Sequence, residues 1–153
     1  MTSKPISEPD RDRDLRNLDP IFREKLIAVL AEMEALGTPF KLSEGFRTEK
    51  RQAWLFGQGR MSAPFGREGP KVTNANGITK LSNHQGTGEP GTGCAADCYP
   101  AGADGKIIWP PPSDSDARWE LYARAAEKRG LVAGYRWKQP HDPPHIELRK
   151  ARK

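Results

Sequence analysis

Residues 94–99 read Cys-Ala-Ala-Asp-Cys-Tyr, a pattern that predicts a β-strand. Successive side chains of a strand point to opposite faces, so Cys94 and Cys98 share one face and Asp97 lies on the other. Four residues along a strand span about 13 Å, which exceeds the roughly 7 Å limit for a disulfide. We therefore expect both cysteines to be reduced and buried. The Asp97 carboxylate lies among small alanines and needs a cation or a hydrogen-bond donor nearby.

Two helices with clear start signals are expected before this strand. Asp19 is placed as an N-cap with Pro20 at the first helical position, and Gly37 ends the apolar stripe that follows. Thr48 can cap a second helix that ends around residues 57–59. The other expected elements are strands over residues 40–46, 107–109 and 145–148, an Asp-Gly hairpin turn at 103–106, and a helix over 115–128. Helices mixed with short antiparallel strands indicate the α+β class, with a short antiparallel sheet and flanking helices.

The composition fits one basic domain: 153 residues, 29% of them charged, with a formal net charge of +5. No apolar run approaches the roughly 18 residues of a membrane span. Residues 1–14 alternate Arg and Asp and lack the apolar stretch of a secretory signal, so we expect a disordered segment there. The domain is expected over residues 15–149, followed by a basic tail at 150–153. Such a tail favours polyanions (nucleic acid, a membrane surface or an anionic cell wall) unless it is simply a solvated terminus.

A long irregular stretch and three histidines carry the candidate chemistry. Residues 58–93 are rich in Gly, Asn, Thr and Ser without periodicity, which indicates a functional loop, and His84 lies near its end. His141 and His145 are separated by Asp-Pro-Pro, and the prolines exclude the helix on which such a pair would bind zinc. In a strand, by contrast, His145 and Glu147 share one face.

A carboxylate and two imidazoles from separate elements can form a metal site. His84, Asp97 and His145 would give a tetrahedral zinc site with one open position. An open position suits hydrolysis, because zinc makes water a nucleophile at neutral pH and a nearby carboxylate accepts the proton. Asp142 precedes His145 on a stiff, extended linker that can hold its carboxylate at a fixed distance from the imidazole. The alternative is a proline-stiffened surface turn without chemistry.

Four motifs follow one another along the chain: Ser43-Glu44-Gly45-Phe46-Arg47-Thr48 with Gln52, then Ser82-x-His84, Gly93-x-Ala95-x-Asp97 and Asp142-x-x-His145. In this order they resemble the motifs of the LAS-type peptidoglycan metallopeptidases. Within that family the resemblance is to the VanY-like D-alanyl-D-alanine carboxypeptidases and the phage L-alanyl-D-glutamate endopeptidases, and it covers roughly residues 21–148. It implies the hedgehog/D-Ala-D-Ala peptidase-like fold, a small domain with the zinc site in a cleft.

The resemblance implies a role for each matching residue. The implied Zn2+ ligands are His84, Asp97 and His145, the implied general base is Asp142, and the implied hydrogen-bonding residues toward the peptide are Gln52 and Ser82. Arg47 would lie by the open metal position, where it would stabilise the oxyanion or hold a substrate carboxylate. Glu147 would orient His145.

The spacing of the first two implied ligands departs from the family. His84 and Asp97 lie thirteen residues apart, whereas the family has them in one compact motif. Residues 87–92 form the insertion, which can loop out without moving its ends because added loop length costs little entropy. Without it the ligand position would fall on Gly91, which cannot bind a metal. Glu89 is the alternative carboxylate.

We expect a zinc-dependent peptidase that cuts the stem peptides of bacterial peptidoglycan at the L-alanyl-D-glutamate bond. The alternatives are a D-alanyl-D-alanine carboxypeptidase and a non-catalytic, zinc-stabilised cell-wall-binding protein. Asp142 argues against the latter, since a structural site needs no base. A nucleic-acid-binding protein is disfavoured, because the sequence has no zinc-finger spacing and no recognisable nucleic-acid module.

The small domain without a signal peptide is typical of a phage endolysin, and a bacterial prophage protein would look the same. Such a protein is made in the cytoplasm and reaches the cell wall after holin-type release. We expect a monomer whose basic tail contacts anionic wall or outer-membrane polymers.

Overall fold

The computed structural model describes residues 7–139 and 141–149, which form helices packed on a four-stranded antiparallel sheet. The strands are β1 (Phe40–Glu44), β2 (Ala95–Pro100), β3 (Val132–Ala133) and β4 (His145–Glu147), in the order β1-β2-β4-β3. The helices are α1 (Pro20–Ala35), α2 (Glu49–Gly57) and α3 (Ala117–Glu127), with short 3-10 turns η1 (Leu15–Asn17) and η2 (Gly134–Arg136). This architecture confirms the α+β class with a short antiparallel sheet and flanking helices.

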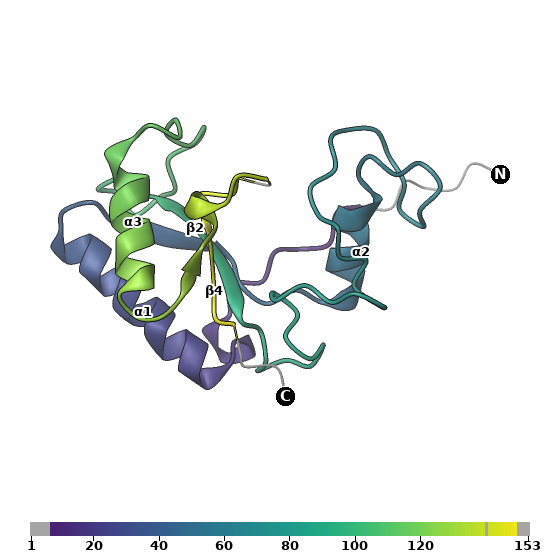
Figure 1. Ribbon diagram of the computed structural model, residues 1–153, viewed down its shortest axis with the longest axis horizontal. Coiled ribbons are helices and arrows are strands. Elements are labelled where there is room, and N and C mark those ends of the chain that lie inside the picture. The colour runs from purple at the N-terminus through teal and green to yellow at the C-terminus, as the bar shows by residue number, and fades with distance from the viewer. Residues whose placement is uncertain (1–6, 140, 150–153) are drawn as a thin grey trace.

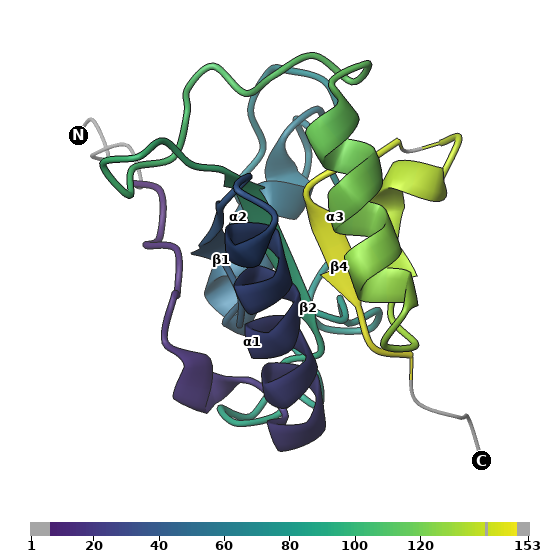
Figure 2. The ribbon, with the colours of Figure 1, turned by 90° about the vertical axis from the view of Figure 1, so that its left-hand side faces the viewer.

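The core lies between the sheet and two of the helices. α1 and α3 lie side by side against one face of the sheet, whereas α2 lies on the opposite side with the long loop beside it (Figures 1 and 2). Phe40 of β1 stacks on Tyr122 of α3 with 4.5 Å between ring centroids, and it meets Trp119 edge-on at 5.6 Å. Fully buried residues in this core include Phe22, Leu26, Val29, Met33, Ala96, Cys98 and Ile146.

The other face of the sheet carries polar residues. Cys98 of β2 and Ile146 of β4 belong to the core. Because side chains alternate along a strand, Asp97, His145 and Glu147 point to the opposite face, toward the side on which α2 lies. The alternation predicted for both strands places the candidate site on that face.

Local capping signals start the helices where the sequence predicts. The Asp19 carboxylate accepts hydrogen bonds from the N–H groups of Ile21 and Phe22 at the start of α1. The Thr48 hydroxyl accepts one from the Arg51 N–H at the start of α2. These side chains satisfy N–H groups that have no partner within the helix.

Two of the predicted elements differ from the structure. The hairpin turn forms, but the strand predicted over residues 107–109 does not, since a single bridge joins Ile107 to Ala101. Three prolines follow directly and cannot donate to a sheet. The helix predicted from residue 115 begins at Ala117, because Asp116 is its N-cap. β3 was not predicted, since two residues are too few to show a pattern.

Residues 8–14, here called the N-terminal segment, contact the domain, so this part of the segment expected to be disordered over residues 1–14 is ordered. Residues 1–6 of that prediction lie outside the described residues. The Gly45 N–H donates to the carbonyl oxygen of Asp12 at 2.8 Å. The Arg13 side chain donates to the carbonyl oxygen of Ser43 at 3.1 Å. Few apolar side chains are needed here, because the segment is held along β1 by hydrogen bonds.

Other expectations concern the cysteines, the tail and the membrane. Cys94 and Cys98 are buried thiols that form no disulfide, as expected. The basic tail expected at residues 150–153 lies outside the described residues. Within the described ranges, no helix combines the length and apolar character needed to cross a bilayer.

Candidate metal centre

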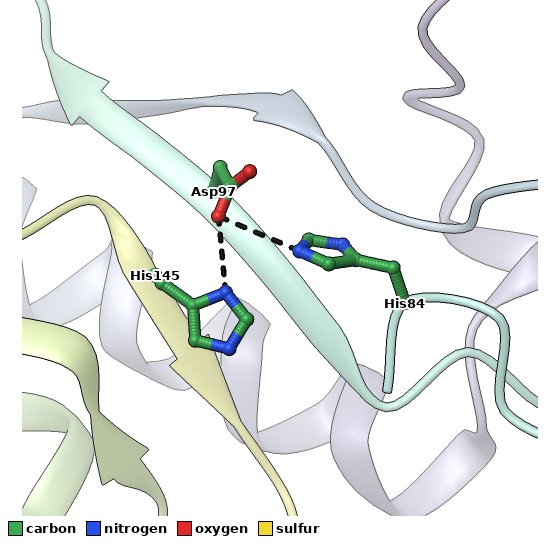
Figure 3. Close-up of side chains that lie close together, drawn as sticks. All are labelled: His84, Asp97 and His145. Atoms are coloured by element: carbon green, nitrogen blue, oxygen red, sulfur yellow. Dashed lines mark hydrogen bonds and ion pairs between the residues drawn. The ribbon is translucent and has the colours of Figure 1, made fainter. Parts of the chain in front are cut away.

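Three side chains from separate parts of the chain converge on the polar face of the sheet. Asp97 of β2 and His145 of β4 pair directly across the sheet, and His84 comes from the loop that precedes β2. Oδ1 of Asp97 lies 3.6 Å from Nε2 of His84 and 3.3 Å from Nδ1 of His145 (Figure 3). One ligand atom from each residue lies within 4.8 Å of the other two. The structure thus brings together the three residues that the motifs single out.

The second nitrogen of each imidazole is already engaged. His84 directs Nδ1 to the carbonyl oxygen of Gly45 at 2.8 Å, and His145 directs Nε2 to Oε1 of Glu147 at 2.7 Å. A nitrogen that donates its proton in this way leaves the other nitrogen with a free lone pair. Nε2 of His84 and Nδ1 of His145 are therefore the atoms available to a metal, and both face Asp97. The orienting role predicted for Glu147 fits this contact.

Charges around the centre keep its groups in distinct protonation states. Burial, and then the nearby guanidinium of Arg47, lower the pKa of His84. Burial alone would raise the pKa of Asp97, but His84 and the hydrogen bond with His145 hold it well below its ordinary value. Burial alone would lower the pKa of His145, but the hydrogen bonds to Asp97 and Glu147 raise it to about 9. Without a metal, a proton on His145 balances the Asp97 carboxylate.

The donor set fits a catalytic zinc ion. Two imidazole nitrogens and one carboxylate oxygen are ligands that zinc prefers, and three protein ligands leave the fourth position open. His84 and His145 are buried, with 2% and 7% of their surfaces exposed. Because the ring nitrogen of each histidine that points away from Asp97 is also hydrogen-bonded, the site is preorganised for a cation. A bound ion would take the place of the proton on His145.

The insertion over residues 87–92 closes on itself and leaves the ligands in place. The Thr87 N–H donates to the Thr92 hydroxyl at 3.0 Å. Gly86 has a φ of +60°, and a Cβ there would lie 1.8 Å from the carbonyl oxygen of Thr92, so only glycine fits this closure. Glu89 is exposed and lies outside the His–Asp–His group, which does not support it as the alternative ligand.

Asp142 lies beside the centre without joining the three-residue group. Its Oδ2 is 3.9 Å from Nδ1 of His145. The backbone fixes the residue, because its N–H donates to Gly134 and its carbonyl oxygen accepts from the N–H of His145, each at 3.1 Å. Burial, and then the negative charge of Asp97, raise the pKa of Asp142 to about 6. A carboxylate with such a pKa is suited to exchange protons near neutral pH.

Arg47 contacts a ligand of the centre directly. Its Nη2 lies 3.2 Å from Oδ2 of Asp97 and 3.1 Å from Oε1 of Glu44, and its Nη1 donates to Oε1 of Gln52 at 3.3 Å. Asp97 therefore offers Oδ1 to the imidazoles and Oδ2 to the guanidinium. Nε of Arg47 is buried and has no hydrogen-bond partner among the residues that the structure describes.

The two polar residues expected to bind the peptide are used within the protein. Gln52 is fully buried, and its amide donates to the Thr73 hydroxyl and to the carbonyl oxygen of Ala75. The Ser82 hydroxyl accepts from the N–H of His84 at 3.2 Å and so shapes the loop at the ligand. The Gln52 side chain has no exposed surface in this structure, and the substrate contacts of Gln52 and Ser82 stay predictions.

A buried ion-pair network was not anticipated from the sequence. Glu44 bridges Arg47 and Arg51, with its Oε2 2.8 Å from Nε of Arg51. Arg51 is 2% exposed and also pairs with Glu8 of the N-terminal segment. The sequence offered one signal for this network, because Glu44 lies in the same motif as Arg47. Its other partner, Arg51, lies outside that motif. The network fixes the guanidinium that contacts Asp97.

A cavity of about 720 Å³ borders the centre. Trp137 and Glu147 line it, and both contact His145, the indole with 5.0 Å between ring centroids. Asn83 also lines it and donates to Glu147. The metal centre thus adjoins a space large enough for a peptide segment, in agreement with the cleft expected from the resemblance.

Comparisons with known proteins agree with this geometry. Residues 76–148 match a family model described as D-alanyl-D-alanine carboxypeptidase. The chain is 30% identical over 136 residues to the peptidoglycan L-alanyl-D-glutamate endopeptidase CwlK of Bacillus subtilis (strain 168), covering 86% of this chain and 74% of that protein. Its fold is similar to that of the Serratia marcescens L-Ala D-Glu endopeptidase ChiX (TM-score 0.55, 22% identity, 95% of this chain and 92% of that one). It is also similar to that of the D,D-pentapeptidase VanY from a VanB-type resistance cassette, solved with Zn(II) (TM-score 0.51, 13% identity, 95% and 80% covered).

Proposed function

Because this chain belongs to the M15 family of peptidoglycan metallopeptidases, we propose that it is a zinc-dependent L-alanyl-D-glutamate endopeptidase. The curated relative CwlK carries that activity in its name. The observation that carries the proposal is the group of His84, Asp97 and His145, whose remaining ring nitrogens are engaged, with Asp142 beside it.

His84, Asp97 and His145 would hold the zinc ion. When bound, zinc supplies the Lewis acidity that makes water a nucleophile at neutral pH. The protein keeps the ligands in place through Gly45, which accepts from His84, and Glu147, which accepts from His145.

Asp142 moves the proton in this mechanism. Its carboxylate accepts a proton from the attacking water as the new C–O bond forms at the L-alanyl carbonyl carbon. The same group then gives that proton to the D-glutamate nitrogen as the C–N bond breaks, so the leaving group departs as a neutral amine. The Arg47 guanidinium lies next to Asp97 and stabilises the negative charge that develops on the carbonyl oxygen.

The second candidate is a D-alanyl-D-alanine carboxypeptidase on the same site. The family model over residues 76–148 carries that description. Both bonds precede a D-residue whose α-carboxylate is free in the stem peptide. The two substrates differ beyond that residue, because D-glutamate continues through its side chain into the rest of the peptide, whereas D-alanine is terminal. The cavity beside the centre offers room for a continuing chain and favours the endopeptidase.

Mass spectrometry of purified peptidoglycan incubated with the protein, with and without a chelator, tests the proposal. Chelator-sensitive release of peptides with new D-glutamate N-termini is the expected result. Loss of a single terminal D-alanine would establish the carboxypeptidase instead. If metal-loaded protein left several wall types intact, a non-catalytic wall-binding protein would replace both.

A further inference from the structure

We propose that the cavity beside the metal centre is a carboxylate-binding subsite for the stem peptide, with Lys80 as its specificity-determining cation. The inference rests on the proposed function and assigns the part of the substrate that the cavity takes. It follows from the position of the cavity, its charge and its hydrogen-bonding groups.

The cavity wall touches the centre from two directions. On one side Trp137 and Glu147 contact His145. On the other side the wall contains Thr73 and Ala75, which accept both amide hydrogens of Gln52. Gln52 in turn accepts from Arg47. A peptide whose scissile bond lies at the centre can therefore extend into this space.

The residues that line the cavity carry a net positive charge after the ion pairs among them are counted. The only carboxylate among the lining residues is Glu147, and both of its oxygens are used: Oε1 by His145, and Oε2 by Asn83 and by Arg149 at 2.9 Å. Arg149 is thereby neutralised. Lys80 lines the same cavity and forms no ion pair within the described part of the chain. The cavity thus presents one uncompensated cation.

A second polar residue of the same lining, Asn74, also suits a peptide carboxylate. The Asn74 amide uses its oxygen to accept from Arg60, which leaves its NH₂ group as a donor at the cavity. An ammonium with an amide donor recognises a carboxylate by charge and by hydrogen bonds. The stem peptide offers two such groups beyond the scissile bond: the free α-carboxylate of D-glutamate, and a carboxylate of the diamino acid attached to it.

Three synthetic peptides distinguish these sources. All three carry an amide on the α-carboxyl group of diaminopimelate, and the first is L-alanyl-γ-D-glutamyl-meso-diaminopimelate with its other carboxylates free. The second carries an amide in place of the D-glutamate α-carboxylate, and the third an amide on the side-chain carboxylate of diaminopimelate. Steady-state cleavage of each is compared for the wild-type protein and the variants Lys80→Gln and Lys80→Arg. Lys106→Gln is the matched control, because Lys106 is an exposed lysine in the turn after β2 and does not line the cavity.

Lys80→Gln should raise KM for the first peptide on the order of fivefold with kcat nearly unchanged, as for loss of one exposed ion pair. Lys80→Arg should restore KM, and Lys106→Gln should not change it. The amidated peptide on which Lys80→Gln has no effect identifies the carboxylate that is bound. An equal effect on all three peptides, or no effect on any, would overturn the subsite.

Binding gives a readout that does not need turnover. Calorimetric titration of the metal-free proteins with the same peptides should show the same loss of affinity for Lys80→Gln. If the wild-type protein cleaves no peptide but binding still depends on Lys80 and on one carboxylate, the proposed reaction fails and the subsite stands. If cleavage occurs and neither KM nor binding depends on Lys80, the subsite fails and the reaction stands.

Discussion

Oε1 of Glu147 lies 2.7 Å from Nε2 of His145, so only Nδ1 of that imidazole is directed at Asp97. The two residues share one face of β4, and the contact fixes both the orientation of the ring and its tautomer.

Glu147→Ala should therefore weaken zinc binding about 10- to 100-fold, the usual effect of removing a group that orients a metal-bound histidine. Competition with a chromophoric chelator measures the affinity. Glu127→Ala removes a carboxylate that forms an exposed ion pair with Arg136 at the end of α3, on the other side of the sheet, so it should leave the affinity unchanged. Equal affinities for the wild-type and Glu147→Ala proteins would show that His145 does not depend on this contact.

Asp142→Asn should lower kcat about 10²- to 10⁴-fold while zinc affinity changes little, because the amide keeps the shape of the side chain but cannot accept the proton. Zinc content and kcat are measured on the same preparation. Asp114→Asn is the control, since Asp114 is an exposed carboxylate paired with His141. Substantial turnover by Asp142→Asn would remove Asp142 as the base.

Zinc affinity should rise with pH between about 6.5 and 9. The pKa of His145 is about 9 without metal, so the ion must displace a proton from this residue at pH 7. The same raised pKa stabilises the metal-free fold below pH 6.5, its ordinary value, and this contribution is lost as the pH rises through about 9. Metal-free and zinc-loaded proteins should therefore differ increasingly in Tm as the pH rises. Titration calorimetry in two buffers of different ionisation enthalpy should detect about one released proton at pH 7. Proton release near zero would show that His145 is already neutral.

Arg51→Met should lower the free energy of unfolding by about 3 kcal/mol, because it leaves part of the charge of the buried Glu44 unpaired. Urea denaturation measures the change. Glu8→Gln removes the half-exposed partner of the same guanidinium and should cost less than about 1 kcal/mol. Similar stabilities for both variants would mean that the buried pair contributes no more than the exposed one.

Short-range sequence patterns were sufficient to predict those elements whose start depends only on neighbouring residues. Asp19 and Thr48 cap α1 and α2 as predicted, because an N-cap acts within three residues of its own position. The alternation over residues 94–99 likewise separates Asp97 from the core. The prediction of a strand over residues 107–109 was wrong, since strand pairing needs a partner strand that the turn alone does not supply.

The candidate site was predicted through the order of its motifs, but apart from the contact of Glu147 with His145 its supporting contacts were not. His84 and Asp97 meet although they are thirteen residues apart, because the insertion closes on itself. The burial of Gln52 depends on the path of a loop more than twenty residues away, to which its amide donates. Helix spacing carries no information about such a distant partner, so the sequence could not distinguish a substrate contact from a structural one.

The N-terminal segment also contacts one of the two open edges of the sheet. β1 and β3 are the two edges of the sheet, and an open edge can template pairing with a second chain and lead to aggregation. β3 has only two residues, too few for such pairing. At β1, backbone and side-chain groups of Asp12 and Arg13 already occupy Gly45 and Ser43. The N-terminal segment thus satisfies two backbone groups at one end of the longer edge, and charged residues beside a sheet edge disfavour edge-to-edge pairing.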